Sequence, residues 1–336
     1  MDPITQGVIG ATASLSAAKR QHIRIAALLG LVGGMAPDLD VLIRSDHDPL
    51  LFLEFHRHFT HALLFIPIAG LLLSLFLFPW VKKHCSYLHT YAYVTLGYAT
   101  HGLLDACTTY GTQLFWPLND ERVAWNIISV IDPLFTLPLL VLLLLLVGFR
   151  WSRLSVLACG WVVLYLGLGL IQQQRAISSA ESLAEARGHA PLVIEAKPSF
   201  GNLVVWKTIY LLDERFYVDA VRVGLTPQVI SGESIDQLNL NRDFSWLDSQ
   251  SQQAIDVERF RWFSNDYLAQ DPRQPTRIID IRYSMLPHQA TGLWGIRLSP
   301  GADSNDHAQY EVFRRADNQT RQQFWRMITG EYFAAP

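Results

Sequence analysis

The chain has 336 residues, of which 50% are hydrophobic and only 17% are charged, and its formal net charge is −3. Soluble domains carry about 25% charged residues, so this composition favours a membrane protein with a soluble part. The near balance of 27 basic against 30 acidic residues argues against a nucleic-acid binder, and three cysteines are too few for a disulfide framework or a thiolate metal cluster.

Charged residues are distributed unevenly along the chain. Residues 1–171 hold 10 Lys and Arg and 10 Asp and Glu, whereas residues 172–336 hold 17 and 20. The change falls at 171–175, where a long apolar run gives way to polar helix formers. We therefore predict an α-helical multi-pass membrane domain over residues 1–171, followed by a small α+β soluble domain over residues 172–336.

Six apolar segments follow one another in the first domain. The first two, 4–18 and 23–35, are short. At ~1.5 Å per residue the second covers roughly 20 Å, less than the ~30 Å hydrocarbon core of a bilayer. This pair either crosses with the help of its neighbours or stops part-way as a re-entrant pair. The other four have the length of full spans: 62–80, 91–107, 133–149 and 154–171.

The soluble domain shows both strand and helix patterns. β-branched and aromatic residues predict strands within 203–223, 277–285 and 292–298. Helices are expected at 249–263 and 318–328, the second with Asp317 as its N-cap. The domain carries no Gly-x-Ser-x-Gly elbow, Walker A motif or Cys-x-x-Cys pair, so we expect a packing or lid role rather than a second active site.

Positive charges between the apolar segments predict the orientation of the chain. If the segments alternate in direction, seven basic residues fall on the same side: Lys19, Arg20, Arg24, Lys82, Lys83, Arg150 and Arg153. Because cytoplasmic loops are enriched in Lys and Arg, this side is expected to be the cytoplasm. The soluble domain then lies outside the cytoplasm.

Ionisable residues gather at the opposite ends of the apolar segments. They are Asp38, Asp40, His56, His58, His61, His101, Asp105 and Asp132. Ionisable groups inside a membrane are costly, and they usually mark a functional site. The shared end therefore predicts one polar cluster at the non-cytoplasmic face.

Local spacing supports a metal site in this cluster. His101 and Asp105 are four residues apart and project from one face of a helix. Pro37 is expected to hold Asp38 and Asp40 in an extended segment, where alternate residues share a face. Thr60 is expected to cap a helix that starts at His61, with His56 in the preceding loop.

The donor types point to particular metals. Imidazoles combined with carboxylates suit Zn²⁺, Mn²⁺ or Fe²⁺ better than Ca²⁺ or Mg²⁺. We expect zinc first, bound by His56, His61, His101, Asp105, Asp38 and Asp40. Six ligands are enough for two ions, and Asp38 or Asp40 can serve as general base.

Simpler explanations exist for several of these residues. Asp38 and Asp40 can form a solvated acidic pair at a helix end, and His58 can be an exposed neighbour. His101 and Asp105 can form a hydrogen-bonded pair that packs two helices. Asp132, which precedes Pro133, can cap the following helix.

The ordered motifs of the first domain resemble a known family. The matching stretches are MDPITQ at 1–6, GMAPDLD at 34–40, HRHFTH at 56–61, THGLLDACT at 100–108, YGTQL at 110–114 and IDPLFT at 131–136. They are similar to the YdjM-like (DUF457) inner-membrane proteins. The resemblance implies a membrane-bound, metal-dependent hydrolase in the bacterial inner membrane.

Some positions depart from the family pattern. The family commonly has Gly where this chain has His58, and Ser where it has Ala62. Other branches have His where Gln6 stands, which implies that Gln6 borders the site. We place four residues around the metal without assigning them as ligands: Gln6, His58, Thr109 and Asp132.

Two classes of function follow from these observations. The first is a metal-dependent hydrolase that cleaves an ester or phosphoester, with a lipid-linked molecule as the expected substrate. The second is a non-enzymatic membrane protein or transporter whose His and Asp cluster binds or passes an ion. A polar track that continues to the cytoplasmic side would favour the second class. The lipid bilayer is the expected partner in both.

Overall fold

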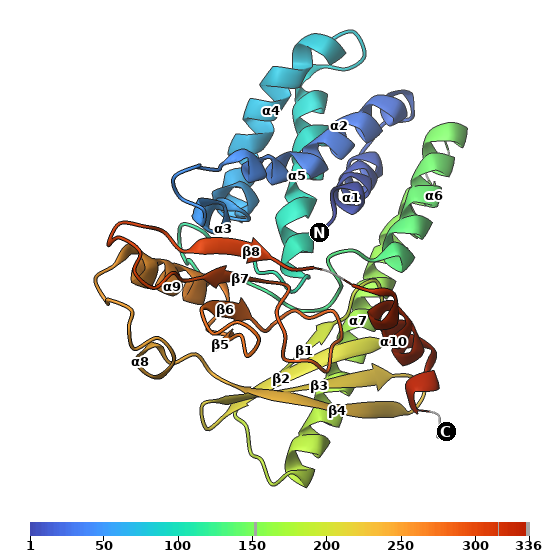
Figure 1. Ribbon diagram of the computed structural model, residues 1–336. Coiled ribbons are helices and arrows are strands. Elements are labelled where there is room, and N and C mark those ends of the chain that lie inside the picture. Colours follow the sequence, from blue (N-terminus) through green and yellow to red (C-terminus); the bar gives the residue numbers. More distant parts are fainter. Residues whose placement is uncertain (151–152, 315, 334–336) are drawn as a thin grey trace. The chain divides into compact units, whose positions relative to one another are not determined.

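The computed structural model describes residues 1–150, 153–314 and 316–333 (Figure 1). The chain forms two compact units. The first comprises Met1–Ile43, Phe55–Ile171 and Phe200–Asn202, and the second comprises Arg44–Glu54, Gln172–Ser199 and Leu203–Pro336. The division between Ile171 and Gln172 falls inside one continuous helix, α7 (Arg153–Ala186).

The first unit is helical. Its α-helices besides α7 are α1 (Pro3–Ser16), α2 (Ile23–Met35), α4 (Ile66–Val81), α5 (Tyr87–Ala106) and α6 (Pro133–Phe149). Short 3-10 helices connect them: η1 (Arg20–His22), η2 (Ala36–Leu42), η3 (Phe59–His61) and η4 (Leu63–Phe65). Helix α3 (Leu51–Phe55) crosses the boundary between the two units.

Three helical stretches of the described chain are long and apolar enough to cross a membrane. They are Arg20–Leu42, Leu63–Val81 and Leu154–Ala186, and Pro133–Phe149 is a shorter apolar helix. The first stretch has 23 residues, because helical winding continues beyond Met35 into η2. Our estimate of a segment ending at residue 35 was therefore too short.

Helices α1, α2 and α5 pack with their backbones in near contact. A Cβ atom at Gly97 would lie 2.3 Å from the carbonyl oxygen of Gly30, and one at Gly10 would lie 2.4 Å from the same oxygen. Only glycine permits this approach, which is typical of small residues at helix interfaces in membranes. The close packing brings the start of α1 and the end of α2 against the C-terminal half of α5.

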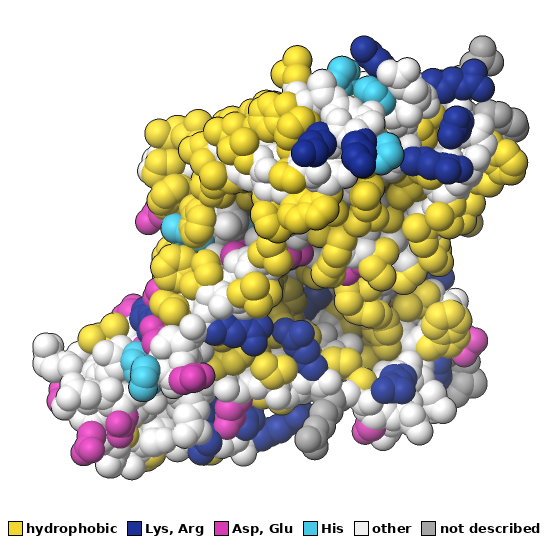
Figure 2. Space-filling model, turned by 90° about the horizontal axis from the view of Figure 1, so that it is seen from above, with side chains coloured by type: hydrophobic (Ala, Val, Ile, Leu, Met, Phe, Trp, Pro, Cys, Tyr) yellow, Lys and Arg dark blue, Asp and Glu magenta, His cyan; other side chains and the backbone are white. Residues whose placement is uncertain are grey.

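The outer surface of the helical unit is strongly apolar. Leu72 and Phe76 on α4, Leu144 on α6 and Val163 on α7 are each between 59% and 72% exposed. Figure 2 shows hydrophobic side chains over much of one view, with one group of Lys and Arg side chains toward its upper right and others in its lower half. Exposed apolar area of this extent is costly in water and matches a lipid environment.

The second unit contains two four-stranded antiparallel sheets. One has the order β1 (Ile194–Pro198), β2 (Val205–Leu212), β3 (Arg215–Val223) and β4 (Pro227–Asp236). The other has the order β5 (Leu268–Gln270), β6 (Arg277–Asp280), β7 (Trp294–Arg297) and β8 (Gln309–Val312). Three α-helices, α8 (Leu240–Asp243), α9 (Gln252–Phe263) and α10 (Asn318–Thr329), and the 3-10 helix η5 (Glu331–Phe333) complete the described elements.

Both sheets contribute to one apolar core. Ile209 and Val218 of the first sheet pack with Ala269 and Ile279 of the second. Strands β2 and β3 form a tight hairpin, in which Leu212 pairs with Arg215 across two residues of positive φ. Positive φ at both central residues matches the twist of the strands.

The predicted fold class is confirmed: a helical membrane part is followed by an α+β domain. The expected strand region 203–223 forms β2 and β3, and the expected helices form α9 and α10. Asp317 caps α10, because its carboxylate accepts a hydrogen bond from the Thr320 amide. Strands β1, β4, β5 and β8 were not predicted.

Candidate metal centre

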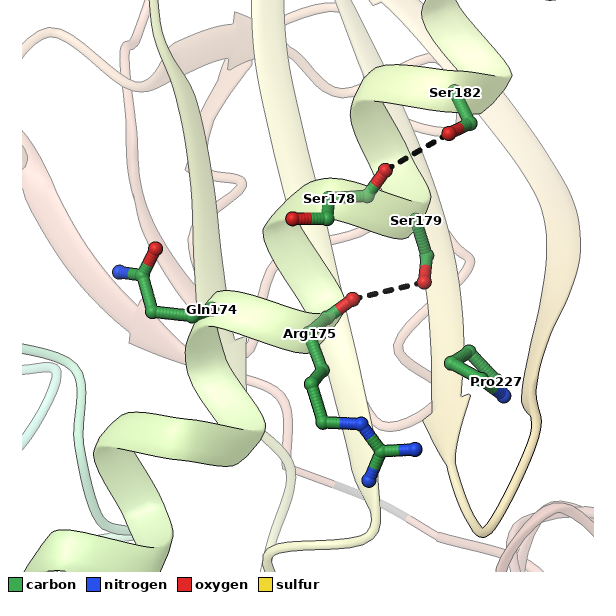
Figure 3. A pocket seen from close by; sticks show the side chains of 6 residues that line it. All are labelled: Gln174, Arg175, Ser178, Ser179, Ser182 and Pro227. Atoms are coloured by element: carbon green, nitrogen blue, oxygen red, sulfur yellow. Dashed lines mark hydrogen bonds between the residues drawn. The ribbon is translucent and has the colours of Figure 1, made fainter.

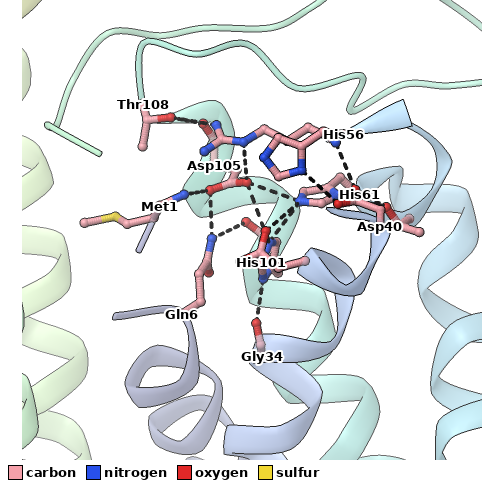
Figure 4. Close-up of polar contacts among 12 residues, drawn as sticks. Met1, Gln6, Gly34, Asp40, His56, His61, His101, Asp105 and Thr108 are labelled. Carbon is pink, nitrogen blue, oxygen red and sulfur yellow. Dashed lines mark hydrogen bonds and ion pairs between the residues drawn. The ribbon is translucent and has the colours of Figure 1, made fainter. Parts of the chain in front are cut away.

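Four ionisable side chains from three elements converge in the helical unit. Asp38 comes from η2, His61 from η3, and His101 and Asp105 from α5. One ligand atom of each lies within 4.8 Å of the others. Asp38, Asp40 and His56 form a second such group, so Asp38 belongs to both. Figure 4 shows how most of these side chains point toward one another.

The first group is closely spaced around two imidazole nitrogens. Nε2 of His61 lies 3.0 Å from Nε2 of His101. Oδ2 of Asp105 lies 3.3 Å from Nε2 of His61 and 3.6 Å from Nε2 of His101. The side chains of His61, His101 and Asp105 have no exposed surface. The cluster is thus a buried set of nitrogen and oxygen donors.

Hydrogen bonds determine which nitrogen of His101 carries the proton. Nδ1 of His101 lies 2.5 Å from the carbonyl oxygen of Gly34, which can only accept, so Nδ1 is the donor. In the neutral ring, Nε2 then presents its lone pair to the cluster. The same argument applies to His61.

The Thr60 hydroxyl settles the orientation of His61. This hydroxyl donates to Oδ2 of Asp40 at 2.9 Å, which leaves its oxygen to accept from Nδ1 of His61 at 3.0 Å. Nε2 of His61 therefore faces Nε2 of His101, and two lone pairs 3.0 Å apart require a cation between them.

In the absence of a metal ion, a proton fills this role. Burial acts to lower the pKa of His61, but the nearby carboxylates of Asp105, Asp38 and Asp40 outweigh burial and raise the pKa to about 10. The carboxylates thus hold a positive charge at this position. This cluster could hold a metal ion in place of the proton.

Asp105 supplies a second sign that the cluster suits a cation. Its Oδ1 accepts from Nε2 of Gln6 at 2.8 Å and from the amino group of Met1. Its Oδ2 accepts no hydrogen bond from the described residues, although Nε of Arg57 lies 3.0 Å away. A buried carboxylate oxygen without a hydrogen bond is rare in proteins and fits a metal ligand.

Asp40 has a different environment from Asp105. Its Oδ1 lies 2.8 Å from Nδ1 of His56, and its Oδ2 accepts from the Arg57 amide and from Thr60, each at 2.9 Å. Burial lowers the pKa of His56, which favours a neutral ring. Asp40 therefore holds the 56–61 loop in place through both of its oxygens.

Two local expectations about these segments were wrong. Asp38 and Asp40 lie in the 3-10 helix η2, and Ala36 before Pro37 has helical angles (φ −63°, ψ −36°). Pro37 is tolerated because it opens the new helix, where no amide donor is needed. With about three residues per turn, Asp38 and Asp40 point in different directions.

Thr60 does not cap the helix of the next span. Helix α4 begins at Ile66, and its N-cap Phe65 makes no side-chain hydrogen bond. The Thr60 hydroxyl is used by Asp40 instead, and its carbonyl accepts from the Tyr98 hydroxyl at 2.6 Å. Tertiary contacts therefore outweigh the local capping preference.

The four residues that we placed around the metal without assigning them as ligands have different environments in the structure. Gln6 contacts Asp105, and Thr109 is buried in the segment that follows α5. His58 packs against Trp116, with ring centroids 5.1 Å apart. Asp132 caps α6 through the Leu134 and Phe135 amides and also accepts from the Tyr165 hydroxyl. In the described residues, neither metal-ligand group includes His58 or Asp132.

Our sequence reasoning missed Arg57 and the Gly34 carbonyl. Both lie inside motifs that we had singled out, at 56–61 and 34–40. Arg57 is 3% exposed and contacts Asp105. Its position in the sequence between His56 and His61 was a signal that could have identified it.

A shallow pocket of about 400 Å³ lies in the second unit, and Figure 3 shows the residues that line it. They are Gln174, Arg175, Ser178, Ser179, Ser182 and Pro227. Ser179 and Ser182 donate to the carbonyls of Arg175 and Ser178. Among the described residues, no metal-ligand group includes a residue of this pocket.

The apolar helices and the buried cluster define a helical membrane protein with a candidate metal centre. The chain belongs to the YdjM inner membrane protein family, whose model matches residues 1–176. It is 31% identical over 105 residues to the inner membrane protein YbcI of Escherichia coli K12. That match covers 30% of this chain and 60% of the relative's length. No solved structure matches the chain.

Proposed function

We propose that the protein is a membrane-bound, metal-dependent hydrolase that cleaves an ester or phosphoester at the non-cytoplasmic membrane face. The observation that carries this proposal is the convergence of His61, His101, Asp105 and Asp38 on one buried point. A lipid-linked substrate fits a site on helices with an apolar outer surface.

The donor set favours Zn²⁺, with Mn²⁺ or Fe²⁺ as alternatives. His61 and His101 would bind through Nε2, Asp105 through Oδ2 and Asp38 through Oδ1. When bound, such an ion supplies Lewis acidity that polarises the ester and activates water. Gly34 and Thr60 orient the two rings, while Gln6 and Arg57 hold the Asp105 carboxylate.

Asp38 is the better candidate for the general base. Its side chain is 19% exposed, so entering water can reach it, whereas the Asp40 side chain has no exposed surface. Both oxygens of Asp40 are also occupied by hydrogen bonds. Of the two aspartates considered for this role, the geometry supports Asp38.

Ion passage is less well supported. Directly behind the cluster, α1, α2 and α5 pack backbone against backbone at Gly10, Gly30 and Gly97. This packing leaves little room for a polar track that continues through the helices.

Metal analysis of the purified wild-type protein tests the proposal. We expect bound divalent metal, which His101→Ala and Asp105→Asn remove, because each substitution deletes a ligand and leaves its buried partners mismatched. His58→Gly is the matched control and should retain the metal. Unchanged metal content in both His101→Ala and Asp105→Asn would show that these residues only pack two helices together.

A further inference from the structure

Helix α7 carries the apolar part of the chain into the second unit without a break. Three of its exposed apolar side chains are Leu164 (65% exposed), Leu168 (46%) and Ile171 (60%). They follow one another at steps of four and three residues, and Arg175 comes four residues later. Residues at these steps share one face of a helix. The apolar face of α7 therefore leads directly to Arg175.

The length of α7 indicates where Arg175 lies along the membrane normal. At ~1.5 Å per residue, a hydrocarbon core of ~30 Å takes about 20 residues, which counted from Leu154 reaches about residue 173. The headgroups occupy roughly 5–7 Å on each side of this core. We therefore expect Arg175 at the level of the lipid headgroups.

The turn between β3 and β4 is held beside this part of α7. The turn, residues 224–226, joins the paired ends of the two strands. Nε2 of Gln172 donates to the carbonyl of Val223 at 2.9 Å, at the end of β3. Nη2 of Arg175 donates to two carbonyls of the turn, at 2.6 and 2.9 Å. All these residues belong to the second unit, and their contacts fix the turn at headgroup level.

Leu225, in the middle of this turn, is 104% exposed. Single exposed leucines are common at protein surfaces, so the position of Leu225 carries the argument. The Leu225 carbonyl is bonded to Arg175, which continues the apolar face of α7. An apolar side chain at this level can enter the boundary between headgroups and acyl chains. The bilayer that surrounds α7 is thus the surface that covers Leu225.

The shallow pocket of the second unit lies at the same place (Figure 3). Its volume is about 400 Å³, and besides Pro227 its lining residues are polar. Arg175 lines the pocket and is half-buried. Nη1 of Arg175 donates to Oε1 of Gln172 at 2.8 Å, and Nη2 donates to the turn. Within the described residues, the Nε proton and one Nη1 proton remain to donate to a ligand.

We propose that the β3–β4 turn and this pocket form a lipid-contact site, in which Leu225 enters the bilayer interface and Arg175 binds a lipid phosphate. Guanidinium groups are well suited to phosphate oxygens, and every phospholipid headgroup carries a phosphate. The partner is the leaflet at which α7 leaves the membrane. The site is separate from the candidate metal centre and does not depend on the proposed function.

A nitroxide label at Leu225→Cys in the full chain, embedded in nanodiscs of phosphatidylethanolamine and phosphatidylglycerol, tests the apolar contact. Leu192→Cys is the matched control, because Leu192 is 101% exposed and follows the far end of α7. Both variants are made in Cys159→Ser, since Cys159 is exposed whereas the other two cysteines are buried.

Collisions of the label with oxygen and with a water-soluble nickel reagent provide the measurement. The ratio of oxygen to nickel collisions should be at least about threefold higher at position 225 than at position 192, because oxygen concentrates in lipid and the nickel reagent in water. Equal ratios at the two positions would overturn the proposal.

Calorimetric titration of the detergent-solubilised full chain with short-chain phosphatidylcholine in mixed micelles tests the phosphate contact. Arg175→Gln should bind this lipid several-fold more weakly than the wild type. Arg215→Gln is the control and should bind as the wild type does, since Arg215 is an exposed arginine at the other end of β3 that pairs with Asp236.

Diacylglycerol of the same chain length separates a phosphate contact from a general structural effect. It lacks phosphate, so its binding should be unchanged in Arg175→Gln. Wild-type affinity for phosphatidylcholine in this variant, or an equal loss of affinity for diacylglycerol, would overturn the role of Arg175. If Arg175→Gln does not fold, the nitroxide comparison still decides the proposal, because it alters only exposed positions.

Discussion

Asp40 and Asp105 differ in role although both are buried aspartates beside histidines. Asp105 presents Oδ2 to both Nε2 atoms, whereas Asp40 contacts the opposite nitrogens, at Nδ1 of His56 and His61. A carboxylate that bonds the far side of a ligand ring orients the ring and raises its basicity. We therefore infer that Asp40 positions the ligands from behind, instead of binding the metal as we first expected.

The substitution Asp40→Asn tests this distinction. We expect a loss in metal affinity of roughly 10- to 100-fold, the range seen when a partner of a metal ligand is removed. Asp105→Asn should abolish binding under the same conditions. Metal titration of both variants provides the measurement, and equal losses would identify Asp40 as a direct ligand.

Lys207 is a second residue whose environment gives a testable result. It lies on β2, where its Nζ donates to Ser284 and to the carbonyl of Gln289, each at 2.8 Å. Burial lowers its pKa to about 7, partly offset by Asp280 and Glu233. The unfolded chain binds more protons at Lys207 between this value and the usual value of about 10.4, so the stability contribution rises with pH across that window.

Thermal unfolding of the full chain at several pH values measures this effect. Relative to Lys207→Met, the wild type should gain stability as the pH rises from about 7 to about 10. The difference between the two proteins isolates Lys207 from other titrating groups. If the difference in stability between the two proteins does not change with pH, the pKa of Lys207 is not lowered in the folded chain.

At the scale of elements, the contact between α2 and α5 determines the geometry of the cluster. His101 on α5 bonds to the carbonyl of Gly34 near the end of α2, four residues beyond Gly30. A side chain at Gly97 would collide with the Gly30 backbone, which cannot yield as a flexible side chain would. The two helices would have to separate, and His101 would lose its hydrogen bond.

We expect Gly97→Ala to destabilise the protein by about 1–3 kcal/mol, as overpacked interiors do, and to weaken metal binding. Gly167→Ala on α7 is the matched control, since nothing lies within 4 Å of its Cβ position. That substitution should be neutral or stabilising by up to ~1 kcal/mol, because alanine favours helix more than glycine does. Similar unfolding midpoints for both variants would contradict the close helix contact.

At the scale of the whole molecule, the charge pattern leads to a prediction of topology. A reporter that is active only outside the cytoplasm should be active when fused after Pro336. A fusion within the loop that carries Lys82 and Lys83 should be inactive, since positive loops stay in the cytoplasm. Activity of the second fusion alone would place the cluster at the cytoplasmic face.

Much of the architecture could be predicted from local sequence. Apolar length and charge distribution indicated the helical membrane part, and β-branched and aromatic residues indicated β2, β3, β6 and β7. The motifs that contain Asp38, His61, His101 and Asp105 were recognisable because costly ionisable groups interrupt apolar segments. In the structure, one ligand atom from each of these four residues lies within 4.8 Å of the others.

The remaining features depend on contacts between distant segments. The turn of η2 at Asp38, the use of Thr60 by Asp40 and the tautomer of His101 are set by neighbours from other elements. Arg122 carries no local signal, because only the folded loop brings it to the ring of Tyr110. Apolar patterning is a property of a short segment, and the sequence alone determined the helices and the candidate ligands. Hydrogen-bond direction and charge pairing depend on which segments meet, and those features only the tertiary structure decided.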